Sequence, residues 1–279
     1  MNGILTAVGV VAAIGVVCAV ILILASRYMR VDSNEKEKAI RDVLPGANCG
    51  ACGYTGCDGY AKALANGDTD KTNLCVPGAD AVSRAIANVT GLEAGDVVEK
   101  VATVKCLGDC NMTSDKSEYA GIKTCSAARM LYGGKGACIY GCIGFGDCAA
   151  ACPSGAICIE NGIAHVNTKL CTGCGLCVGA CPQHIIHLMD DVDKVLVTCS
   201  NNEKGSEVRG KCKHGCIGCG KCAKGCTVGA VEVVNNLAVI DYDKCINCGK
   251  CAENCPVGCI MVSDFSGIHR YTVYEDANS

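Results

Sequence analysis

Cysteines at the spacing of iron–sulfur ligands dominate the C-terminal part of the chain. Two runs there each contain three cysteines separated by two residues, and a fourth that follows after three more residues. Three thiolates at this spacing can bind three irons of one 4Fe-4S cluster, whereas the fourth lies too far along the turn and reaches a second cluster. The spacing therefore predicts two crossed sets of ligands for clusters that carry single electrons. The first set is Cys216, Cys219, Cys222 and Cys255, and the second is Cys245, Cys248, Cys251 and Cys226.

This crossed arrangement is typical of bacterial ferredoxins with two clusters. A pair of zinc sites is the alternative, because Cys-x2-Cys also suits tetrahedral zinc, but zinc needs neither a third cysteine at the same interval nor a crossed partner. A disulfide framework would also account for many cysteines. Sulfurs at every third residue favour metal-binding turns instead, so the pattern indicates iron–sulfur clusters in a reducing compartment.

The composition is that of small modules held together by metal. The chain of 279 residues has 28 cysteines and 35 glycines but no tryptophan and only two phenylalanines. Large apolar cores cannot be built from so few aromatic side chains, and metal binding to thiolates supplies folding free energy instead. The formal net charge is −3, and the basic residues are scattered without the aromatic-interleaved patch of a nucleic-acid interface. Nothing in the sequence indicates binding to nucleic acid.

The two cysteine runs have counterparts earlier in the chain. A shift of 74 residues superimposes eight cysteines of residues 138–181 on those of residues 212–255. It also places Thr124-Cys125-Ser126 on Thr198-Cys199-Ser200, so residues 125–198 and 199–272 read as tandem copies. Each copy contains a predicted β-hairpin between its cysteine runs. Residues 156–160 turn through Asn161-Gly162 into 163–166, and residues 230–234 turn through Asn235-Asn236 into 237–240.

The first copy departs from the second at one ligand position. Phe145 stands where the second copy has Cys219. Cys138, four residues before Cys142, is the expected substitute, and a three-iron cluster at the incomplete site is the alternative. The two sets expected in this copy are Cys138, Cys142, Cys148 with Cys181, and Cys171, Cys174, Cys177 with Cys152.

A further four-cysteine site is expected near the N-terminus. Three cysteines lie in a glycine-rich loop, and a fourth follows a predicted helix over residues 58–65. The glycines allow the backbone to turn tightly and to point its amides at the sulfurs. Zinc remains an alternative occupant because no crossed ligation applies here. The four residues are Cys49, Cys52, Cys57 and Cys75.

Five cysteines are left outside these sets and could furnish a sixth cluster. We expect Cys106, Cys125 and Cys199 in it, with Cys110 or Cys212 as the fourth ligand. Cys158 and Cys259 have no cysteine at their counterpart positions in the repeat, so they are expected to be packing residues. The cofactors expected are therefore about six 4Fe-4S clusters, and we expect no catalytic residue that transforms a substrate.

The N-terminal residues form an apolar run. From Gly3 to Ala25 the only polar side chain is Thr6, and these 23 residues would span about 34 Å as a helix, enough for one membrane crossing. A signal peptide is the alternative, but the basic start and the A-x-A cleavage site are missing. Five basic residues follow the run and none precedes it, which predicts that the remaining chain is cytoplasmic. They are Arg27, Arg30, Lys36, Lys38 and Arg41.

These features divide the chain into seven parts with an expected α+β fold. We expect one N-terminal transmembrane helix, a small four-cysteine iron–sulfur domain and two tandem ferredoxin-like modules of the two-cluster bacterial type. The expected bounds are 1–26 for the anchor, 27–44 for a charged helical stalk, 45–90 for the four-cysteine domain, 91–137 for a linker with extra cysteines, 138–198 and 199–272 for the modules, and 273–279 for a tail.

The chain resembles the B subunit of Rnf complexes, which are ion-translocating ferredoxin:NAD⁺ oxidoreductases. The loop that carries Cys49, Cys52 and Cys57, with Cys75 beyond it, is similar to the four-cysteine domain that follows the membrane anchor in that subunit. The order of anchor, four-cysteine domain and tandem ferredoxin modules matches the long form of the subunit over nearly the whole chain. The resemblance implies an electron carrier within a translocase of anaerobic metabolism, located in the cell inner membrane.

The resemblance also implies a direction of electron flow. Reduced ferredoxin would donate electrons, and partner subunits in the membrane would reduce NAD⁺ and move Na⁺ or H⁺. The chain itself has no convincing nucleotide-binding fingerprint. We expect ferredoxin to dock on residues 212–260 and the four-cysteine domain to be the exit. Two alternatives stay open: an anchored iron–sulfur subunit of another anaerobic reductase or hydrogenase, and a zinc-binding interaction protein.

Overall fold

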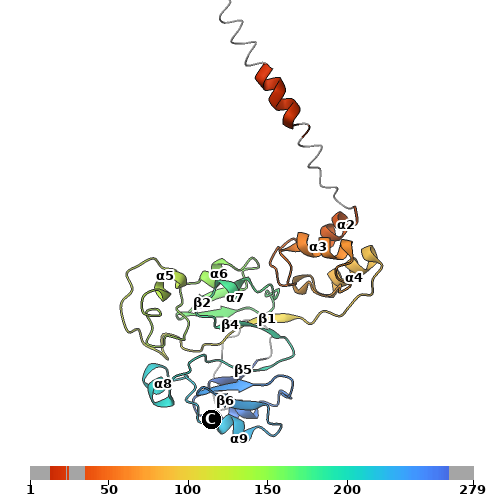
Figure 1. Cartoon of the computed structure of the whole chain (residues 1–279). Coiled ribbons are helices and arrows are strands. Elements are labelled where there is room, and N and C mark those ends of the chain that lie inside the picture. The colour runs from red at the N-terminus through yellow and green to blue at the C-terminus, as the bar shows by residue number, and fades with distance from the viewer. Residues whose placement is uncertain (1–12, 23, 25–34, 264–279) are drawn as a thin grey trace, which may run out of the picture.

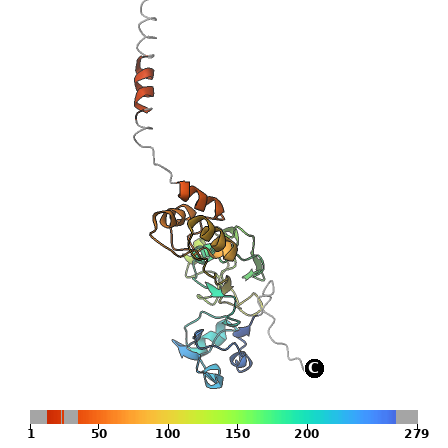
Figure 2. The ribbon, with the colours of Figure 1, turned by 90° about the vertical axis from the view of Figure 1, so that its right-hand side faces the viewer.

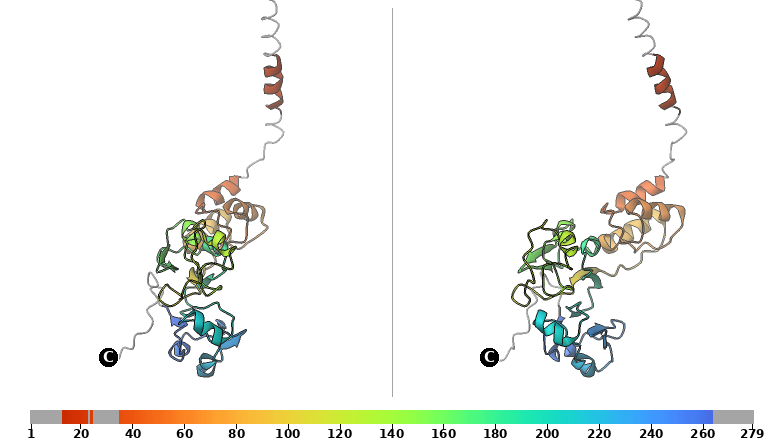
Figure 3. Two further views of the ribbon diagram at one scale, coloured as in Figure 1. Left: turned by 90° about the vertical axis from the view of Figure 1, so that its left-hand side faces the viewer. Right: turned by 60° about the vertical axis from the view of Figure 1, so that its left-hand side comes forward.

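The computed structural model describes residues 13–22, 24 and 35–263. Residues 35–263 form three cysteine-rich units, which we call the four-Cys domain (35–98), the first module (99–191) and the second module (192–263). The first module contacts both of the others: the four-Cys domain flanks it on one side and the second module lies below it (Figure 1). The same order is visible when the molecule is turned (Figure 2 and Figure 3).

Only part of the expected membrane anchor belongs to the described residues. Residues 13–22 are helical, and their side chains, almost all apolar, are exposed. Residues 1–12, 23 and 25–34 lie outside the described part of the chain, as does the expected tail over 273–279. Within the described ranges, no helix combines the length and the apolar character that a membrane crossing requires.

The four-Cys domain consists of three helices and one helical turn around a small core. They are α2 (Glu35–Val43), α3 (Cys57–Asn66), η1 (Val76–Gly78) and α4 (Ala79–Thr90). The helix α2 has charged residues in its first turn, but Ile40 is fully buried against Tyr60 and Ile86. The helix expected in the stalk is therefore present, but it packs on the four-Cys domain and does not stand apart from it.

Each module is built from two antiparallel strand pairs and short helices. The outer pairs are β1 with β4 and β5 with β8, and the hairpins are β2 with β3 and β6 with β7. The first module contains β1 (Lys100–Val104), α5 (Cys125–Arg129), α6 (Asp147–Ala150), β2 (Ile157–Glu160), β3 (Ile163–Val166), α7 (Leu176–Ala180) and β4 (Ile186–Asp190). The second contains β5 (Val195–Val197), α8 (Gly205–Lys211), α9 (Lys221–Gly225), β6 (Val231–Val234), β7 (Leu237–Ile240), α10 (Lys250–Glu253) and β8 (Ile260–Val262).

Both predicted hairpins are present with the predicted turns. Asn161 and Gly162 have φ of 49° and 80°, and Asn235 and Asn236 have φ of 49° and 65°. Positive φ at both central residues is the requirement of the type I′ turn, whose twist matches that of the flanking strands. Asparagine and glycine are the residues that adopt it at least cost, which is why these turns could be read from the sequence.

The strand β1 comes from the segment expected to be a linker. It pairs with β4, with Val104 opposite Ile186, just as β5 pairs with β8, with Val197 opposite Ile260. The residue after each strand donates its N–H across the sheet: Lys105 to the carbonyl oxygen of Ile185 at 2.7 Å. The matching bond runs from Thr198 to Cys259 at 2.8 Å. Part of the 91–137 segment is therefore integral to the first module.

This pairing corrects the repeat alignment at one cysteine. Cys106 follows β1 by two residues, and Cys199 follows β5 by two residues. The structural counterpart of Cys199 is therefore Cys106, whereas the 74-residue shift matches it with Cys125. The shift is misleading because the first module carries an inserted segment between its first strand and its cysteine run. Cys125 lies within that insertion.

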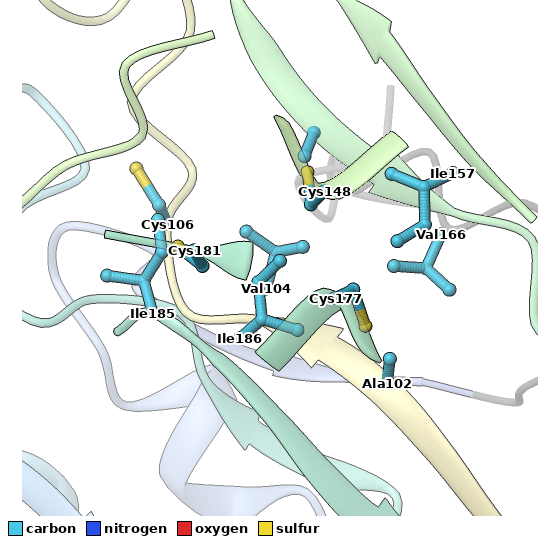
Figure 4. Close-up of a cluster of buried hydrophobic side chains, with 11 residues drawn as sticks. Ala102, Val104, Cys106, Cys148, Ile157, Val166, Cys177, Cys181, Ile185 and Ile186 are labelled. Carbon is cyan, nitrogen blue, oxygen red and sulfur yellow. The ribbon is translucent and has the colours of Figure 1, made fainter. Parts of the chain in front are cut away.

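The core of the first module forms around cysteine side chains. Figure 4 shows Val104, Ile157 and Ile186 gathered about Cys148, Cys177 and Cys181. The second module has a corresponding core that includes Val197, Val231 and Ile260. Aliphatic residues and sulfurs make up most of these small interiors, and Tyr242 packs against the core of the second module.

Candidate iron–sulfur sites

The four-Cys domain holds its expected cysteines around one cavity. Its lining includes Cys49, Cys52, Cys57 and Cys75, and the cavity has a volume of about 310 Å³. The loop before α3 is fixed by Asn48, whose Oδ1 accepts a hydrogen bond from the backbone N–H of Cys57 at 2.9 Å. Gly56 has φ of 120°, and a Cβ there would lie 3.0 Å from that Oδ1. Glycine is therefore required for the loop to close on the asparagine.

The first module holds two cavities, and the first of them contains an unexpected cysteine. This cavity, of about 350 Å³, is lined by Cys125, Cys142, Cys148 and Cys181. The sequence predicts Cys138 at this site; in the structure Cys125 lines the cavity and Cys138 does not. The insertion folds the short helix α5 back over the module, so that Cys125 reaches the space that Phe145 leaves without a sulfur.

Asp147 holds α5 in that position. Its carboxylate accepts hydrogen bonds from the backbone N–H groups of Cys125 at 2.8 Å and Ser126 at 3.0 Å, and from the Ser126 hydroxyl at 2.8 Å. Thr124 caps the same helix through a bond from the Ala127 N–H. Partial burial raises the pKa of Asp147, but the hydrogen bonds outweigh it and leave that pKa below its ordinary value.

The second cavity of the first module is lined by the four cysteines expected there. They are Cys152, Cys171, Cys174 and Cys177, and the cavity has about 300 Å³. Backbone amides point at two of the sulfurs: Ala156 N–H donates to Cys152 Sγ at 3.3 Å, and Ala102 N–H donates to Cys171 Sγ at 3.4 Å. Such amides stabilise negative charge on sulfur.

The second module repeats this arrangement. A cavity of about 290 Å³ is lined by the expected Cys216, Cys219, Cys222 and Cys255, and also by Cys259. For the other expected set, Cys226 accepts the Ala230 N–H at 3.3 Å, which is the counterpart of the bond between Ala156 and Cys152. Cys226, Cys245 and Cys251 belong to one packed cluster. Cys248, the fourth cysteine expected in this set, is exposed at the surface.

A further cavity lies between the two modules. We call it the bridging cavity; it has about 490 Å³ and is lined by Cys106, Cys138, Cys199 and Cys212, and also by Cys142, which lines the first cavity of the first module as well. Three of the cysteines expected at a sixth site, Cys106, Cys199 and Cys212, therefore do line one cavity. Cys125, also expected here, does not line this cavity, whereas Cys138 does. Cys110 is exposed and lines none of these cavities.

The bridging cavity is built from matching positions of the two modules. Cys106 and Cys199 follow the first strand of each module, and Cys138 and Cys212 precede each cysteine run. Gly108 closes one wall, where a Cβ would lie 3.4 Å from Cys212 Sγ and 3.7 Å from Cys106 Sγ. Because Gly108 has no side chain, the space between these sulfurs is not filled by protein atoms.

Asn201 supplies a hydrogen bond to this cavity that no sequence pattern predicts. It is only 1% exposed, and its amide donates to Cys138 Sγ at 3.4 Å and to Glu203 at 3.1 Å. Glu203 is in turn paired with Lys211. Burial in this network fixes the amide on the sulfur, and no local motif marks Asn201 for that role.

The donor sets and cavities fit 4Fe-4S clusters. Around zinc, with Zn–S distances of about 2.3 Å, four sulfurs would close on one ion and leave no cavity between them. Here the cysteines of five of the six sets line open pockets and do not close on a single point. Among the described residues, no three His, Cys, Asp or Glu side chains are grouped closely enough to hold a single metal ion.

Burial keeps several of these thiols protonated in the metal-free chain. It raises the pKa of Cys148 to about 12, with the neighbouring thiols of Cys142 and Cys125 adding to the effect. It likewise raises the pKa of Cys199 to about 11 and of Cys75 to about 11. Thiolates form at these sites only when metal cations compensate the charge, so loading with iron releases protons.

The six sets of cysteines follow one another in a continuous row, each in contact with the next. The N–H of Cys142, in the first module, donates to Cys106 Sγ of the bridging cavity at 3.4 Å. The N–H of Cys216, in the second module, donates to Cys199 Sγ of the same cavity at 3.3 Å. The bridging cavity is thus in direct contact with one site of each module.

The order continues to the four-Cys domain. Gly173, which lies between two cysteines of the first module, packs against Val76. A Cβ added at Gly173 would lie 2.9 Å from Val76 Cγ1. Val76 directly follows Cys75. Within each module the two sites are joined because one short helix segment carries residues of both, as Cys148 and Cys152 do around α6.

Family models match the same three units. The FeS model, for an Fe-S cluster domain, matches residues 44–77. The Fer4 model, a 4Fe-4S binding domain, matches residues 164–187 and 238–261, and another 4Fe-4S binding domain model matches residues 213–229.

Curated relatives extend the match to most of the chain. The chain is 41% identical over 245 residues to the B subunit of the Na⁺-translocating ferredoxin:NAD⁺ oxidoreductase complex of Acetobacterium woodii, covering 88% of this chain and 73% of that protein. It is 41% identical to the B subunit of the proton-translocating complex of Clostridium ljungdahlii, covering 86% and 85%. It is 39% identical to the B subunit of the ion-translocating oxidoreductase complex of Methanosarcina acetivorans, covering 81% and 85%.

With this identity over most of both chains, and with three cysteine-rich units in the matching order, the chain belongs to the family of B subunits of ion-translocating ferredoxin:NAD⁺ oxidoreductase complexes, the Rnf complexes, as their iron–sulfur electron-transfer subunit.

Proposed function

We propose that this chain conducts electrons from reduced ferredoxin through six 4Fe-4S clusters to partner subunits in the membrane. Each cluster, when bound, accepts and releases one electron. The chain contributes the ligands, the amides that stabilise charge on sulfur, and the spacing that keeps neighbouring sites in contact. The six ligand sets are those that surround the five cavities, together with Cys226, Cys245, Cys248 and Cys251.

The observation that carries this proposal is the contact of the bridging cavity with both modules. Cys142 N–H bonds to Cys106 Sγ, and Cys216 N–H bonds to Cys199 Sγ, at 3.4 Å and 3.3 Å. Without a cluster there, the two modules would be separate pairs of redox centres. With one, the centres form an unbroken row from the second module to the four-Cys domain.

The exposure of the cysteines supports entry of electrons at the second module. Cys219 and Cys248 are exposed, whereas Cys174, the counterpart of Cys248 in the first module, is only half-exposed. Electron donors reduce a cluster fastest where its ligands reach the surface. This favours the second module as the docking site and the four-Cys domain, at the other end of the order, as the exit.

Charge supports the same direction. Three exposed lysines follow the exposed cysteines on the adjoining helices α9 and α10: Lys221, Lys224 and Lys250. The matching residues of the first module are Asp147, Ala150 and Leu176. Within the described ranges, none of the three lysines takes part in an ion pair. A basic surface over the clusters suits a small donor with an acidic surface.

The test is the rate at which reduced ferredoxin reduces the full chain, followed by stopped-flow absorbance. Replacing Lys221, Lys224 and Lys250 by glutamate should lower the second-order rate constant by about tenfold or more at low salt, because electrostatic steering is lost. Reduction by dithionite, which needs no docking surface, should be unchanged.

A matched variant carries the same charge change elsewhere. Lys62, Lys71 and Lys169 are exposed lysines of the four-Cys domain and the first module. Their replacement by glutamate should leave the ferredoxin rate within about twofold of the unmodified chain. Equal slowing in both triple variants would show that ferredoxin does not use the second module.

The membrane anchor is part of the proposal. The run Gly3–Ala25 has the composition of a single span, and its described residues 13–22 form a helix with exposed apolar side chains. The basic residues after it favour a cytoplasmic location for the cysteine-rich units. Fractionation of cells that express the chain with and without residues 1–30 tests this: only the full chain should sediment with membranes and resist carbonate extraction.

A further inference from the structure

Cys259 lies at the second module's first site, where the sequence suggested only a packing residue. Its Sγ is 3.5 Å from Cys255 Sγ, and it lines the same cavity as Cys216 and Cys255. It is 1% exposed. Its carbonyl oxygen accepts bonds from both the N–H and the hydroxyl of Thr198, at 2.8 Å and 3.0 Å. The thiol is thus held against Cys255, one of the expected ligands.

The direction of the contact between Cys259 and Cys255 follows from the chemistry. A cysteine that binds iron does so as a thiolate and has no proton to donate. Cys255 can therefore only accept, and Cys259 must be the donor. Four other cysteines already complete the ligand set, so the Cys259 thiol keeps its proton in its buried position.

The first module provides a natural comparison. The residue at the same place is Ile185, which lines the cavity of Cys142, Cys148 and Cys181. Its carbonyl oxygen accepts the Lys105 N–H at 2.7 Å, as that of Cys259 accepts the Thr198 N–H. The two backbones are equivalent, but isoleucine has no proton to donate. The two sites therefore differ by one hydrogen-bond donor.

We propose that the Cys259 thiol raises the reduction potential of the cluster held by Cys216, Cys219, Cys222 and Cys255. This rests on the proposed 4Fe-4S occupant of that site. A donor to ligand sulfur stabilises the reduced state, which carries one more negative charge, more than it stabilises the oxidised state. The electron comes from the reduced donor, the proton stays on Cys259, and no covalent bond forms or breaks.

The test compares reduction potentials in the full iron-loaded chain, by redox titration followed with EPR. In Cys259→Ala and Cys259→Ile, the reduction potential of this cluster should become more negative. The reduction potentials of the other clusters should not change. Cys259→Ser keeps a donor of similar size and should restore most of the difference. The reciprocal change, Ile185→Cys, should make one potential of the first module more positive.

A second measurement separates hydrogen bonding from packing. Electron–nuclear double resonance should detect a proton near the reduced cluster that exchanges in D₂O, present in the unmodified chain and in Cys259→Ser but lost in Cys259→Ala. A structural role alone would not remove this signal while leaving the iron content unchanged.

Iron analysis distinguishes the ways in which the inference could fail. If the unmodified chain carries no iron at this site, the proposed function fails with it. If Cys259→Ala loses about four iron atoms, Cys259 is itself a ligand and the inference is wrong. If iron is retained and no potential moves, the clusters stand but the thiol does not tune them.

Discussion

The carboxylate of Asp147 accepts the backbone N–H of Cys125 at 2.8 Å, although the two residues are 22 positions apart. Through this bond the first module recruits a sulfur from an inserted segment. Phe145 occupies the position where the second module has Cys219, so a fourth sulfur must come from elsewhere. The second module has Lys221 at the position of Asp147. Its fourth sulfur comes from Cys219, so it requires no such bond.

Asp147→Ala should weaken both the fold and the site. Three hydrogen bonds to a carboxylate are lost, which we expect to cost about 2 kcal/mol of unfolding free energy. Cys125 is then no longer held at the cavity, and the site should lose its cluster, about four iron atoms by iron analysis. Ser126→Ala removes only the hydroxyl bond and is the matched control. A complete 4Fe-4S cluster in Asp147→Ala would contradict this role.

Pairs of substitutions distinguish Cys125 from Cys138 as partner of Cys181. If Cys125 and Cys181 share one cluster, the double variant with alanine at both should lose about four iron atoms, no more than either single variant. Cys138→Ala combined with Cys181→Ala should lose about eight, because two clusters are affected. The reverse pattern would restore the assignment that the sequence alone suggested. Iron and sulfide analysis of the purified variants decides between them.

Interrupting the bridging site should divide the chain of centres. In Cys106→Ala or Cys212→Ala, reduction by ferredoxin should stop after about two clusters, those of the second module. Dithionite should still reduce the others. Cys110→Ala is the control, because Cys110 is exposed and lies outside the cavity. Fast reduction of the four-Cys domain in Cys106→Ala would mean that electrons take another route.

The metal-free chain should lose stability at high pH. Burial raises the pKa of Cys148 to about 12 and of Cys199 to about 11, whereas in the unfolded chain both ionise near 9. The folded state then holds protons that the unfolded state releases, so this stability is complete below about pH 9 and is lost as the pH rises toward 11 to 12.

At about pH 10 each such thiol should lower the free energy of unfolding by roughly 1 kcal/mol. Urea unfolding at about pH 8 and about pH 10 would detect this difference. The iron-loaded protein is the comparison. Its thiolates are already bound to metal, so its unfolding midpoint should not fall over this range. A metal-free chain that is equally stable at both pH values would contradict the buried state of these thiols.

The parts of the site that the sequence could predict are those fixed by local geometry. The crossed sets around Cys152 and Cys255 follow from intervals of two and three residues within single turns. The hairpins follow from Asn161-Gly162 and Asn235-Asn236, whose backbones are adapted to positive φ. These features need no knowledge of the remaining fold.

The exchange of Cys125 and Cys138 could not be predicted in this way. Both residues are placed by the folding of the insertion, which depends on Asp147 and on contacts with the second module such as the bond from Thr113 Oγ1 to the carbonyl oxygen of Lys211. Linear alignment matches Cys125 with Cys199 because it cannot distinguish an insertion from a repeat. The position of β1 in the sheet resolves that ambiguity.

The bridging cavity also has a consequence for biogenesis. Its four sulfurs come from both halves of a duplicated polypeptide, and its final contributor, Cys212, is translated long after Cys106. In the proposed arrangement of six clusters, the bridging centre can therefore be completed only after both halves are present and docked. Its spectroscopic appearance would then report that the two halves had joined.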